Sequence, residues 1–534
     1  MNLQKRTCLI YGYIEIDENE DVKTIINSAL FHRLENIIQT SYTAVYPSSV
    51  HNRFIHSIGV YYLGTLAIEG IKKNCASEIL GELTKYERTF KLACLLHDLG
   101  HSPFSHTGEE YYDSVEKKPW DRLKEELSDT DFSNDGDKLG KHPGAAHERM
   151  SALESIIYFK DYIQKDQRSF FVRCIIGLKY REKTDIRNCF IELLNSSTID
   201  VDKLDYLIRD SYFTGFKSVS IDYERLLGSV CIVKNEEDYI LGFTKTGLST
   251  LESVILAHDM ERKWIQGHPV IQYECYLLDS IIYKIVDKFK NEGNEQSKEG
   301  TELFSLDALT TNGLKCNNGK TIRLLSDADI FSIAKNELYD VDAVQEFFNR
   351  DKRRRSLWKT EAEYRYFVEN KIGLDENKKL GPAIESLQKL MNAYREKCKE
   401  LPLIDDNFLT YLEKEIRESS KIDPSLRKDS NTTQKTLALV KKIKKFSTQN
   451  NYKFEYCLRT CKQFNSSFNK DALKEAKIFF DRSKNVDLGE VINLFEQNKP
   501  NENFFYFYVS PQDHANFKTA EFVRVLRDFV DADT

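Results

Sequence analysis

The sequence is poor in the segments that mark membrane, secreted and fibrous proteins. Its 534 residues include only 10 prolines and 23 glycines, and no apolar run reaches the roughly 18 residues that suggest a transmembrane helix. The first residues, MNLQKRTCLIYGYIEIDENED, lack the apolar core of a signal peptide. There is no internal repeat or low-complexity tract. These absences favour a cytoplasmic globular protein with no membrane partner.

Cysteine content and net charge exclude only a few classes of function. The 11 cysteines are scattered, and Cys457 and Cys461 form no more than a weak CxxxC pair, so we expect reduced thiols, many of them in the core. A net charge of −7 gives no overall attraction to nucleic acid. The 41% hydrophobic and 30% charged residues permit an enzyme without specifying its reaction.

Apolar periodicity predicts a mainly α protein with a minor β component at the N-terminus. Residues 8–16, CLIYGYIEI, alternate like a strand or hairpin arm. From about Val22 to Lys290, apolar residues recur three and four apart, as in helices. Residues 113–146 are polar and contain Gly and Pro, which predicts an insertion or loop with one short helix.

A chain of this length is expected to form two or more structural units. A polar break at 291–304 separates an N-terminal part, 1–290, from a charged, mixed and mostly helical C-terminal part, 291–534. In the second part NFFYFYV is rich in aromatic residues, and helical signals occur at 384–398, 407–419 and 434–446.

Residues 95–106, LLHDLGHSPFSH, concentrate titratable side chains in a chain that has only 11 histidines. Burying each of them unpaired would cost several kcal/mol, so a plain core helix does not explain the segment. His97 and Asp98 lie near the end of an apolar helix, for which Gly100 is the predicted terminator. An imidazole beside a carboxylate suits a divalent ion such as Mn, Fe, Zn or Mg.

Two other segments carry histidine and aspartate residues that could join His97 and Asp98 at one site. His56 leads into the helix-compatible run that follows HNRF, and Asp202, Tyr206 and Asp210 recur at steps of four along one helix face. Asp205 and Arg209 form a separate i,i+4 pair that can be a plain surface salt bridge. An HD dipeptide alone is most simply a surface helix end, but these additional residues favour a site.

The order His, His-Asp and distant Asp resembles the HD superfamily of metal-dependent phosphohydrolases. The segments YGYIEI, FHRLENIIQ, VYPSSVHNRFIHSIGVYYLG, LLHDLGHSPFSH, HERMS and IDVDKLDYLIRD resemble, more closely, the deoxynucleoside triphosphate triphosphohydrolases. That family includes bacterial dGTPase-like enzymes and the animal sterile-alpha-motif and HD-domain dNTPase. The resemblance spans about residues 8–270. It implies an HD-domain helical core and cleavage of a dNTP at the α-phosphate, which gives deoxynucleoside and inorganic triphosphate.

The resemblance also implies roles for individual residues. A divalent metal would be held by His56, His97, Asp98 and Asp202, and a second Mg is expected with the triphosphate. The catalytic group would be His101, His106, Glu109 and His147, with a histidine acting as nucleophile or as general acid toward the leaving 5′-oxygen. The substrate would be bound by Arg53, Lys203 and Tyr206 at the phosphates and by Gln39 and Asp210 at the sugar 3′-hydroxyl.

Some positions depart from the family pattern. His258 stands where a phosphate-contacting arginine is expected, and Gln266 where a tyrosine excludes a 2′-hydroxyl. These changes put selection of dNTP over NTP in doubt, although Arg262, one turn away, could supply the charge. His268 remains in register and is interpreted as structural. Cys8 and Glu35, at the expected guanine-reading positions, argue against a GTP activator bound in that manner.

The C-terminal half suggests interaction roles. The basic run RDKRRRSLWK (350–359) resembles a segment that contributes to effector pockets and oligomer contacts, but a solvated helix face explains it equally well. Nucleic-acid binding through this run is weakened by the acidic residues that follow. By resemblance we expect a homo-oligomer, tetramer or hexamer, with a nucleotide effector. The alternatives are an HD phosphohydrolase for another substrate (an NTP, a signalling nucleotide or a single-stranded nucleic-acid end) and a nucleotide-sensing scaffold.

Overall fold

The computed structural model describes most of the chain. The described residues are 4–16, 20–115, 118–132, 143–182, 184–217, 219–235, 238–292, 302–316, 319–398, 403–422, 427–452, 457–459, 470–481, 484–492 and 504–531. They form two compact units. The first unit contains Met1–Arg262, Ile285–Ile333 and Ser466–Asn498, and the second contains Lys263–Lys284, Ala334–Asn465 and Lys499–Thr534. Neither unit is one continuous segment, because the chain passes between them several times.

Helix α3 (Arg53–Asn74) is the core helix of the first unit. It begins after Asn52, whose side chain accepts a hydrogen bond from the Ile55 amide, and it packs against α4 (Leu80–Leu96), α10 (Val201–Thr214) and strand β3 (Val230–Asn235). By length and composition α3 could cross a membrane, but 72% of its most apolar window is buried inside the protein. Burial on nearly all sides explains its apolar character.

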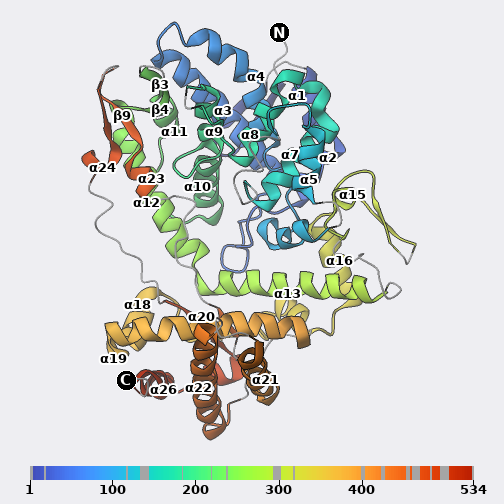
Figure 1. Cartoon of the computed structure of the whole chain (residues 1–534), viewed down its shortest axis with the longest axis vertical. Helices are drawn as coiled ribbons and strands as arrows, with labels where there is room; N and C mark the ends of the chain where they lie inside the picture. The colour runs from blue at the N-terminus through green and yellow to red at the C-terminus, as the bar shows by residue number, and fades with distance from the viewer. Residues whose placement is uncertain are drawn as a thin grey trace. The chain divides into compact units, whose positions relative to one another are not determined.

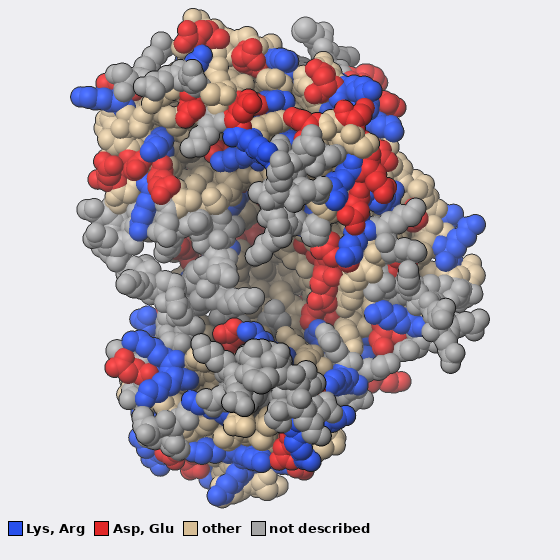
Figure 2. All heavy atoms as spheres, in the orientation of Figure 1, with Lys and Arg blue, Asp and Glu red and all other residues tan. Residues whose placement is uncertain are grey.

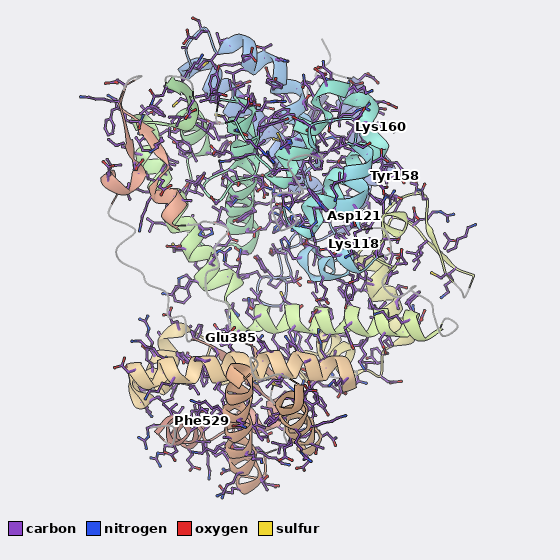
Figure 3. All side chains as sticks on the ribbon, viewed as in Figure 1. Lys118, Asp121, Tyr158, Lys160, Glu385 and Phe529 are labelled. Atoms are coloured by element: carbon purple, nitrogen blue, oxygen red, sulfur yellow. The ribbon has the colours of Figure 1, made fainter. Side chains whose placement is uncertain are left out.

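Several other helices of the first unit pack against α3 or α4 (Figure 1). α4 contacts α7 (Ala146–Phe159), α8 (Arg168–Ile176) and α9 (Arg187–Leu194). The predicted insertion contributes α5 (Pro119–Glu126), which packs on α7; Figure 3 labels residues of both helices. The other α-helices that the described residues form in this unit are α1 (Glu20–Ile26), α2 (Ala29–Arg33), α11 (Tyr223–Leu227), α12 (Leu248–Met260), α15 (Leu306–Leu309), α23 (Lys470–Lys474), α24 (Leu488–Val491) and α16 (Asp327–Glu337), which begins here.

The β structure is more extensive than predicted. β1 (Gln4–Cys8) and β2 (Gly12–Ile16) form the expected N-terminal hairpin. A second sheet has the order β10-β9-β4-β3, in which β3 and β4 (Asp238–Thr244) are antiparallel. β9 (Lys477–Phe479) runs parallel to β4, and β10 (Asn485–Asp487) completes the sheet. The interpretation of residues 22–290 as mostly helical therefore missed a hairpin. A short hairpin β5 (Leu314–Lys315) and β6 (Thr321–Ile322) also occurs.

The second unit is built mainly from long helices. α20 (Leu374–Cys398), α21 (Asp406–Ile422), α22 (Arg427–Gln449) and α26 (Thr519–Asp531) pack together, which confirms the three helical segments predicted there. Its other helices are α13 (Pro269–Glu292), which begins in this unit, α17 (Asp342–Phe348), α18 (Glu361–Tyr364), α19 (Asn370–Ile372) and α25 (Pro511–His514). The NFFYFYV segment supplies β11 (Tyr506–Val509), the central strand between β7 (Arg355–Ser356) and β8 (Cys457–Arg459).

The basic run 350–359 is not a solvated helix face, and that interpretation is wrong. It consists of turns and strand β7, and two of its arginines are buried. Arg353 forms an ion pair with Glu274, and Arg354 pairs with Glu346 and donates to the Tyr273 hydroxyl at 3.0 Å. On the face shown in Figure 2, acidic and basic side chains are interspersed, as expected for a chain with a small net charge.

Candidate active site

Three helices bring the predicted metal ligands together. His56 lies in the first turns of α3, His97 caps the C-terminus of α4 with Asp98 next to it, and Asp202 lies in the first turn of α10. His56 Nε2 is 3.0 Å from Asp202 Oδ1 and 3.4 Å from Asp98 Oδ2, and His97 Nε2 is 3.5 Å from Asp202 Oδ1. The side chains of both histidines and of Asp98 are buried.

The outer nitrogens of the two histidines are held by other groups. His56 Nδ1 lies 2.7 Å from Asp205 Oδ2, and His97 Nδ1 lies 2.9 Å from the Cys94 carbonyl oxygen. Because a carbonyl and an ionised carboxylate only accept, these contacts place a proton on Nδ1 and leave the Nε2 lone pair toward the cluster. Within the described part of the chain, both Nε2 atoms are buried without a hydrogen-bond partner. This donor set therefore fits a divalent metal ion.

Asp205 and Arg209 are buried, so their interpretation as a surface salt bridge is wrong. Asp205 accepts from Arg209 Nε at 2.7 Å and Nη2 at 2.8 Å, and from the Tyr11 hydroxyl at 2.7 Å. Burial opposes the charge on Asp205, but Arg209 and His56 outweigh it and lower its pKa to about 2. A Cβ at position 59 of α3 would lie 2.0 Å from Asp205 Oδ1. Only glycine at this position leaves room for the Asp205–Arg209 pair of α10.

The carboxylates also act on the histidines. Burial disfavours a charged His56, yet Asp202 and Asp205 outweigh burial and raise its pKa to about 9. For Asp98, burial is likewise outweighed, first by Arg53 and then by His97 and His101, which hold its pKa well below the usual range. The carboxylates of this cluster therefore favour a positive charge beside them, either a proton on His56 Nε2 or a divalent ion bound in its place.

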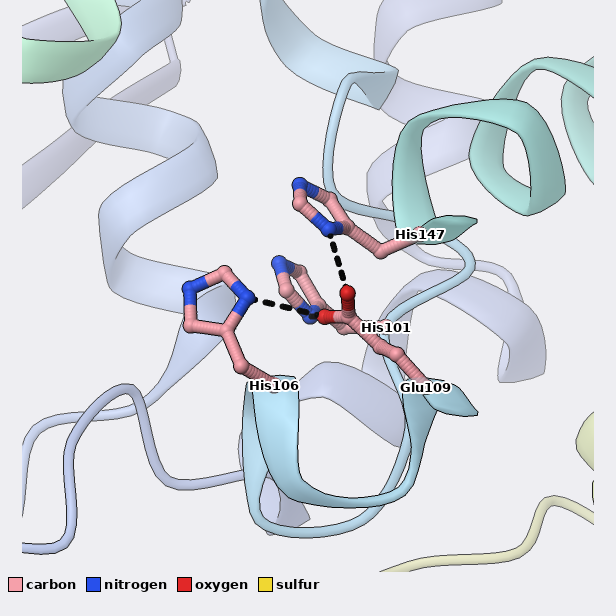
Figure 4. Close-up of side chains that lie close together, drawn as sticks. All are labelled: His101, His106, Glu109 and His147. Atoms are coloured by element: carbon pink, nitrogen blue, oxygen red, sulfur yellow. Dashed lines mark hydrogen bonds and ion pairs between the residues drawn. The ribbon is translucent and has the colours of Figure 1, made fainter. Parts of the chain in front are cut away.

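A second cluster lies beside the first and is centred on Glu109 (Figure 4). Glu109 Oε1 is 3.0 Å from His106 Nδ1, and Oε2 is 2.9 Å from His147 Nδ1. His101 connects the clusters, because its Nε2 lies 3.1 Å from Asp98 Oδ1 and its Nδ1 lies 3.1 Å from Glu109 Oε1. His147 stacks on His101 with ring centroids 4.1 Å apart.

The three histidines differ in environment. The His106 side chain is 68% exposed, whereas His101 is fully buried. Burial, aided by the positive charge of Arg53, lowers the pKa of His101 to about 4, so this ring is neutral at physiological pH. For His147, burial is outweighed by Glu109, which raises the pKa to about 9. His147 is therefore protonated at neutral pH, and it lies beside the exposed imidazole of His106.

The loop between the clusters has an unusual backbone. Phe104 and Ser105 both adopt left-handed conformations, with φ of 56° and 55°, which non-glycine residues rarely do. Helix α4 ends at Leu96, so Gly100 is not its terminator. Glycine is required at position 100 for a different reason, because an added Cβ would lie 2.5 Å from the Ser151 amide nitrogen of α7.

Arg53 ties the predicted phosphate site to the loop. Its Nη1 donates to Asp98 Oδ2 at 2.7 Å, its Nε to Ser105 Oγ at 2.9 Å, and its Nη2 to the Gln39 carbonyl at 3.3 Å. The Gln39 side chain is buried, and its Oε1 has no hydrogen-bond partner among the described residues. The structure thus brings Arg53 and Gln39 to the metal cluster, and their substrate contacts stay a prediction.

Helix α10 carries the other predicted substrate residues. Asp210 Oδ1 lies 2.7 Å from His51 Nε2, and the His51 carbonyl accepts from the Gln39 amide at 3.0 Å, so Asp210 and Gln39 are neighbours through His51. Lys203 donates to the Ser196 carbonyl at 2.7 Å and pairs with Asp200. Tyr206, one turn after Asp202, is partly exposed.

The positions that depart from the family pattern belong to different units. His258 is buried on α12, and its Nε2 accepts a hydrogen bond from Arg262 Nε at 3.1 Å. Burial lowers the pKa of His258 to about 4, which suits that acceptor role. Gln266 and His268 belong to the second compact unit.

Sequence reasoning missed three residues that hold the site. Asp205 was interpreted as a surface residue, because an i,i+4 acid–base pair looks the same on a buried and an exposed helix face. His51 and Ser105 were passed over, although both stand within the motifs that carry the resemblance. Ser105 Oγ accepts from Arg53 and donates to the Ile38 carbonyl at 2.6 Å.

Comparisons with known proteins agree with this geometry. Residues 53–182 match the HD domain family, so the chain contains an HD domain. Part of the chain is also similar to proteins that are named deoxynucleoside triphosphate triphosphohydrolases. The Dictyostelium discoideum protein with that name, a SAMHD1 homolog, is 31% identical to this chain over 221 residues. The aligned part makes up 41% of this chain and 38% of the Dictyostelium protein. The human SAMHD1 is 29% identical over 235 residues, 42% of this chain and 36% of the human protein.

Other similar proteins show how far the likeness extends. An uncharacterized protein of Mycoplasma genitalium is 31% identical over 251 residues, or 46% of this chain and 52% of that protein. The chain thus spans about half, or less, of the length of these relatives. A crystal structure of a phosphohydrolase from Bacteroides thetaiotaomicron has a TM-score of 0.55 at 16% identity, covering 95% of this chain and 100% of that one. A hypothetical protein from Aquifex aeolicus has a TM-score of 0.54 at 18% identity, covering 97% and 99%. These structures share the fold.

Proposed function

We propose that the protein is a metal-dependent triphosphohydrolase that cleaves a deoxynucleoside triphosphate at the α-phosphate, releasing deoxynucleoside and inorganic triphosphate. One observation carries the proposal: His101 joins a His–His–Asp–Asp cation site to a His–Glu–His cluster. The first site suits a phosphate-bound metal, and the second suits proton transfer to a leaving group. A divalent ion held by His56, His97, Asp98 and Asp202 would supply Lewis acidity and an activated water.

In the proposed reaction, water oxygen bonds to the α-phosphorus and the bond from that phosphorus to the 5′-oxygen breaks. The departing 5′-oxygen takes a proton, for which the His106–Glu109–His147 group is the source. Glu109 holds Nδ1 of both histidines, so each Nε2 is the ring nitrogen left to meet the substrate. Exposure of His106 supports its role as the group that reaches the substrate.

The groups proposed to bind the substrate lie around the same centre. Arg53 would offset the phosphate charge. Lys203 would act in the same way once it leaves Asp200, and Tyr206 would contact the phosphates. The unpartnered Oε1 of Gln39 would accept a sugar hydroxyl, and His51 orients Asp210 for a second contact. A Mg ion bound to the triphosphate itself would complete the substrate.

The direct test is a product analysis with purified protein. Each dNTP, alone and in a mixture of four, is incubated with Mn or Mg, and nucleoside, phosphates and triphosphate are separated by ion-exchange chromatography. Deoxynucleoside and triphosphate in equal amounts are expected, and His56→Ala should abolish them. Release of monophosphate or diphosphate nucleotides would overturn the position of cleavage.

A second substrate class is favoured by one observation. His258 stands where an arginine is expected, and Arg262 reaches it from the next turn of the chain. If Arg262 takes over the phosphate contact without restoring a check on the 2′-hydroxyl, ribonucleotides will react at rates close to those of deoxyribonucleotides. The same assay with four NTPs decides between the two classes.

The second unit is proposed to serve assembly and regulation. The relatives named above include enzymes acting on triphosphates, and the helical C-terminal region extends well beyond the HD domain. We expect a homo-oligomer whose size responds to a bound nucleotide. Light scattering with and without dNTP tests this. If His106→Ala leaves assembly intact but abolishes the biological effect, the alternative of a scaffold that acts without catalysis loses its support.

A further inference from the structure

Asp327 is a buried carboxylate that lies far from the catalytic motifs in sequence. It is the first residue of α16 (Asp327–Glu337), beyond the HD domain match, and its exposed fraction is 6%. Its Oδ1 accepts from the Phe104 amide at 2.7 Å, and its Oδ2 accepts from the Ile38 amide at 2.8 Å. One carboxylate therefore bridges two backbone segments of the active site.

Both of those segments continue to the catalytic groups. Phe104 opens the left-handed turn at 104–105, and His106 follows directly. Ile38 precedes Gln39, and the Ile38 carbonyl accepts from Ser105 Oγ at 2.6 Å, so the two segments are also joined to each other. Arg53 then connects Ser105 and the Gln39 carbonyl to Asp98.

Further contacts hold the same loop to the region around Asp327. The Phe331 ring, one helical turn after Asp327, lies edge-on to the Phe104 ring with centroids 4.8 Å apart. Arg33 donates to the Leu325 carbonyl at 3.1 Å and to the Leu99 carbonyl at 2.7 Å, which fixes the other end of the loop. The segment that carries Asp327 is thus linked to the loop on both sides of His101, directly at Phe104 and through Arg33 at Leu99.

We propose that Asp327 is a positioning residue for the loop after α4, which carries Phe104 and His106. Two consecutive left-handed residues are strained, and such a turn persists only where surrounding contacts determine it. The carboxylate supplies an acceptor for the Phe104 amide, which otherwise would be buried unpaired, and it fixes that turn against Ile38. Through the turn it sets the distance between His106 and Glu109. The role rests on the proposed function, because the loop matters for catalysis only if His106 does.

The test compares Asp327→Ala and Asp327→Asn with Asp329→Ala. Asp329 accepts from the Ser326 amide and hydroxyl at 2.8 and 2.7 Å, so its loss loosens the start of α16 without removing a bond to the loop. Asparagine keeps one acceptor oxygen and offers a donor where the second was. A 1 Å displacement of a catalytic group can cost about 100-fold in rate. We expect kcat to fall about 100-fold in Asp327→Ala and less in Asp327→Asn, with KM and bound metal unchanged.

Hydrogen exchange separates this role from the proposed reaction. The amides of Ile38 and Phe104 should exchange at least about 10-fold faster in Asp327→Ala than in the wild type, because each loses its acceptor. Amides of α8 should exchange as before, and Asp329→Ala should leave both site amides protected. Unchanged exchange at Ile38 and Phe104, or an equal effect of Asp329→Ala, would overturn the inference.

If the wild type hydrolyses no dNTP while exchange behaves as expected, only the proposed function fails. Should Asp327→Ala not fold, Asp327→Asn carries the same comparison.

Discussion

Glu154, on α7, is a buried carboxyl group whose two oxygens have no hydrogen-bond partner among the described residues. Burial raises its pKa to about 8, against the ordinary 4.5, although Arg33 acts in the opposite direction. Between those two pH values the unfolded chain releases this proton while the folded protein keeps it. The free energy of unfolding therefore falls as pH rises through this window.

Replacing this carboxyl group with an amide should remove that pH dependence. One pKa unit corresponds to about 1.4 kcal/mol. We therefore expect the change in unfolding free energy caused by Glu154→Gln to be about 2–4 kcal/mol more favourable at pH 8 than at pH 5. Urea unfolding at both pH values measures this gain. The exposed Glu78→Gln serves as control, and an equal shift in both variants would contradict the account.

Asp205 makes a second prediction at the scale of single residues. Its carboxylate orients His56 and raises the basicity of the nitrogen that faces the metal, and losing such a partner typically costs 10–100-fold in metal affinity. We expect Asp205→Asn to weaken metal binding by about 10–100-fold, measured by competition with a chelator on protein shown to be folded by circular dichroism. Tyr11→Phe removes one hydrogen bond to the same carboxylate and keeps its charge. A comparable loss in Tyr11→Phe would show that packing, not the carboxylate, controls affinity.

At this scale the motifs predicted the side chains that gather into the two clusters, but not the residues that hold those side chains in place. His56, His97 and Asp202 do gather at one centre, and His101, His106, Glu109 and His147 gather at another. Asp205 and Asp327 escaped prediction for physical reasons. A buried ion pair and an exposed one share the same spacing, and a carboxylate that bonds to the backbone of a distant loop has no local sequence pattern.

Among the elements, the loop after α4 lies in tight contact with the backbone of helix α7. Gly100 donates its amide to Ser151 Oγ at 2.9 Å, and an added Cβ would lie 2.5 Å from the Ser151 nitrogen and 2.6 Å from the Met150 carbonyl carbon. Since backbone atoms cannot yield as a flexible side chain can, α7 would have to move. That movement would separate His147 from Glu109.

Gly100→Ala should therefore lower both stability and catalysis. We expect a loss of about 2–3 kcal/mol in the free energy of unfolding, which is typical of an overpacked core. Gly81→Ala, in the first turn of α4 with open space around the added Cβ, should be neutral or slightly stabilising. Thermal unfolding of the two variants measures the difference, and equal melting temperatures would contradict it.

Helices were more predictable than sheets in this chain. The periodic segments at 384–398, 407–419 and 434–446 all lie within long helices, because their pattern is local. The pairing of β4 with β9 joins segments more than two hundred residues apart, and β3 alternates too little to stand out from its helical surroundings. No local pattern in either segment specifies its partner.

For the whole molecule, the resemblance predicted the HD domain and the helical class, while the exchange of segments between the two units was not foreseen. Residues 466–498 fold with the first unit although most of the C-terminal half folds with the second. The similarity covers about half or less of the length of these relatives, and experiments on this chain decide its substrate preference, assembly and effector binding.

The central claim is that the linked clusters release intact triphosphate from a dNTP. The most direct measurement is hydrolysis in water enriched in oxygen-18, with mass spectrometry of both products. Attack at the α-phosphorus predicts one heavy oxygen in the triphosphate and none in the deoxynucleoside. Heavy oxygen in the nucleoside, or labelled monophosphate with no triphosphate, would contradict the account.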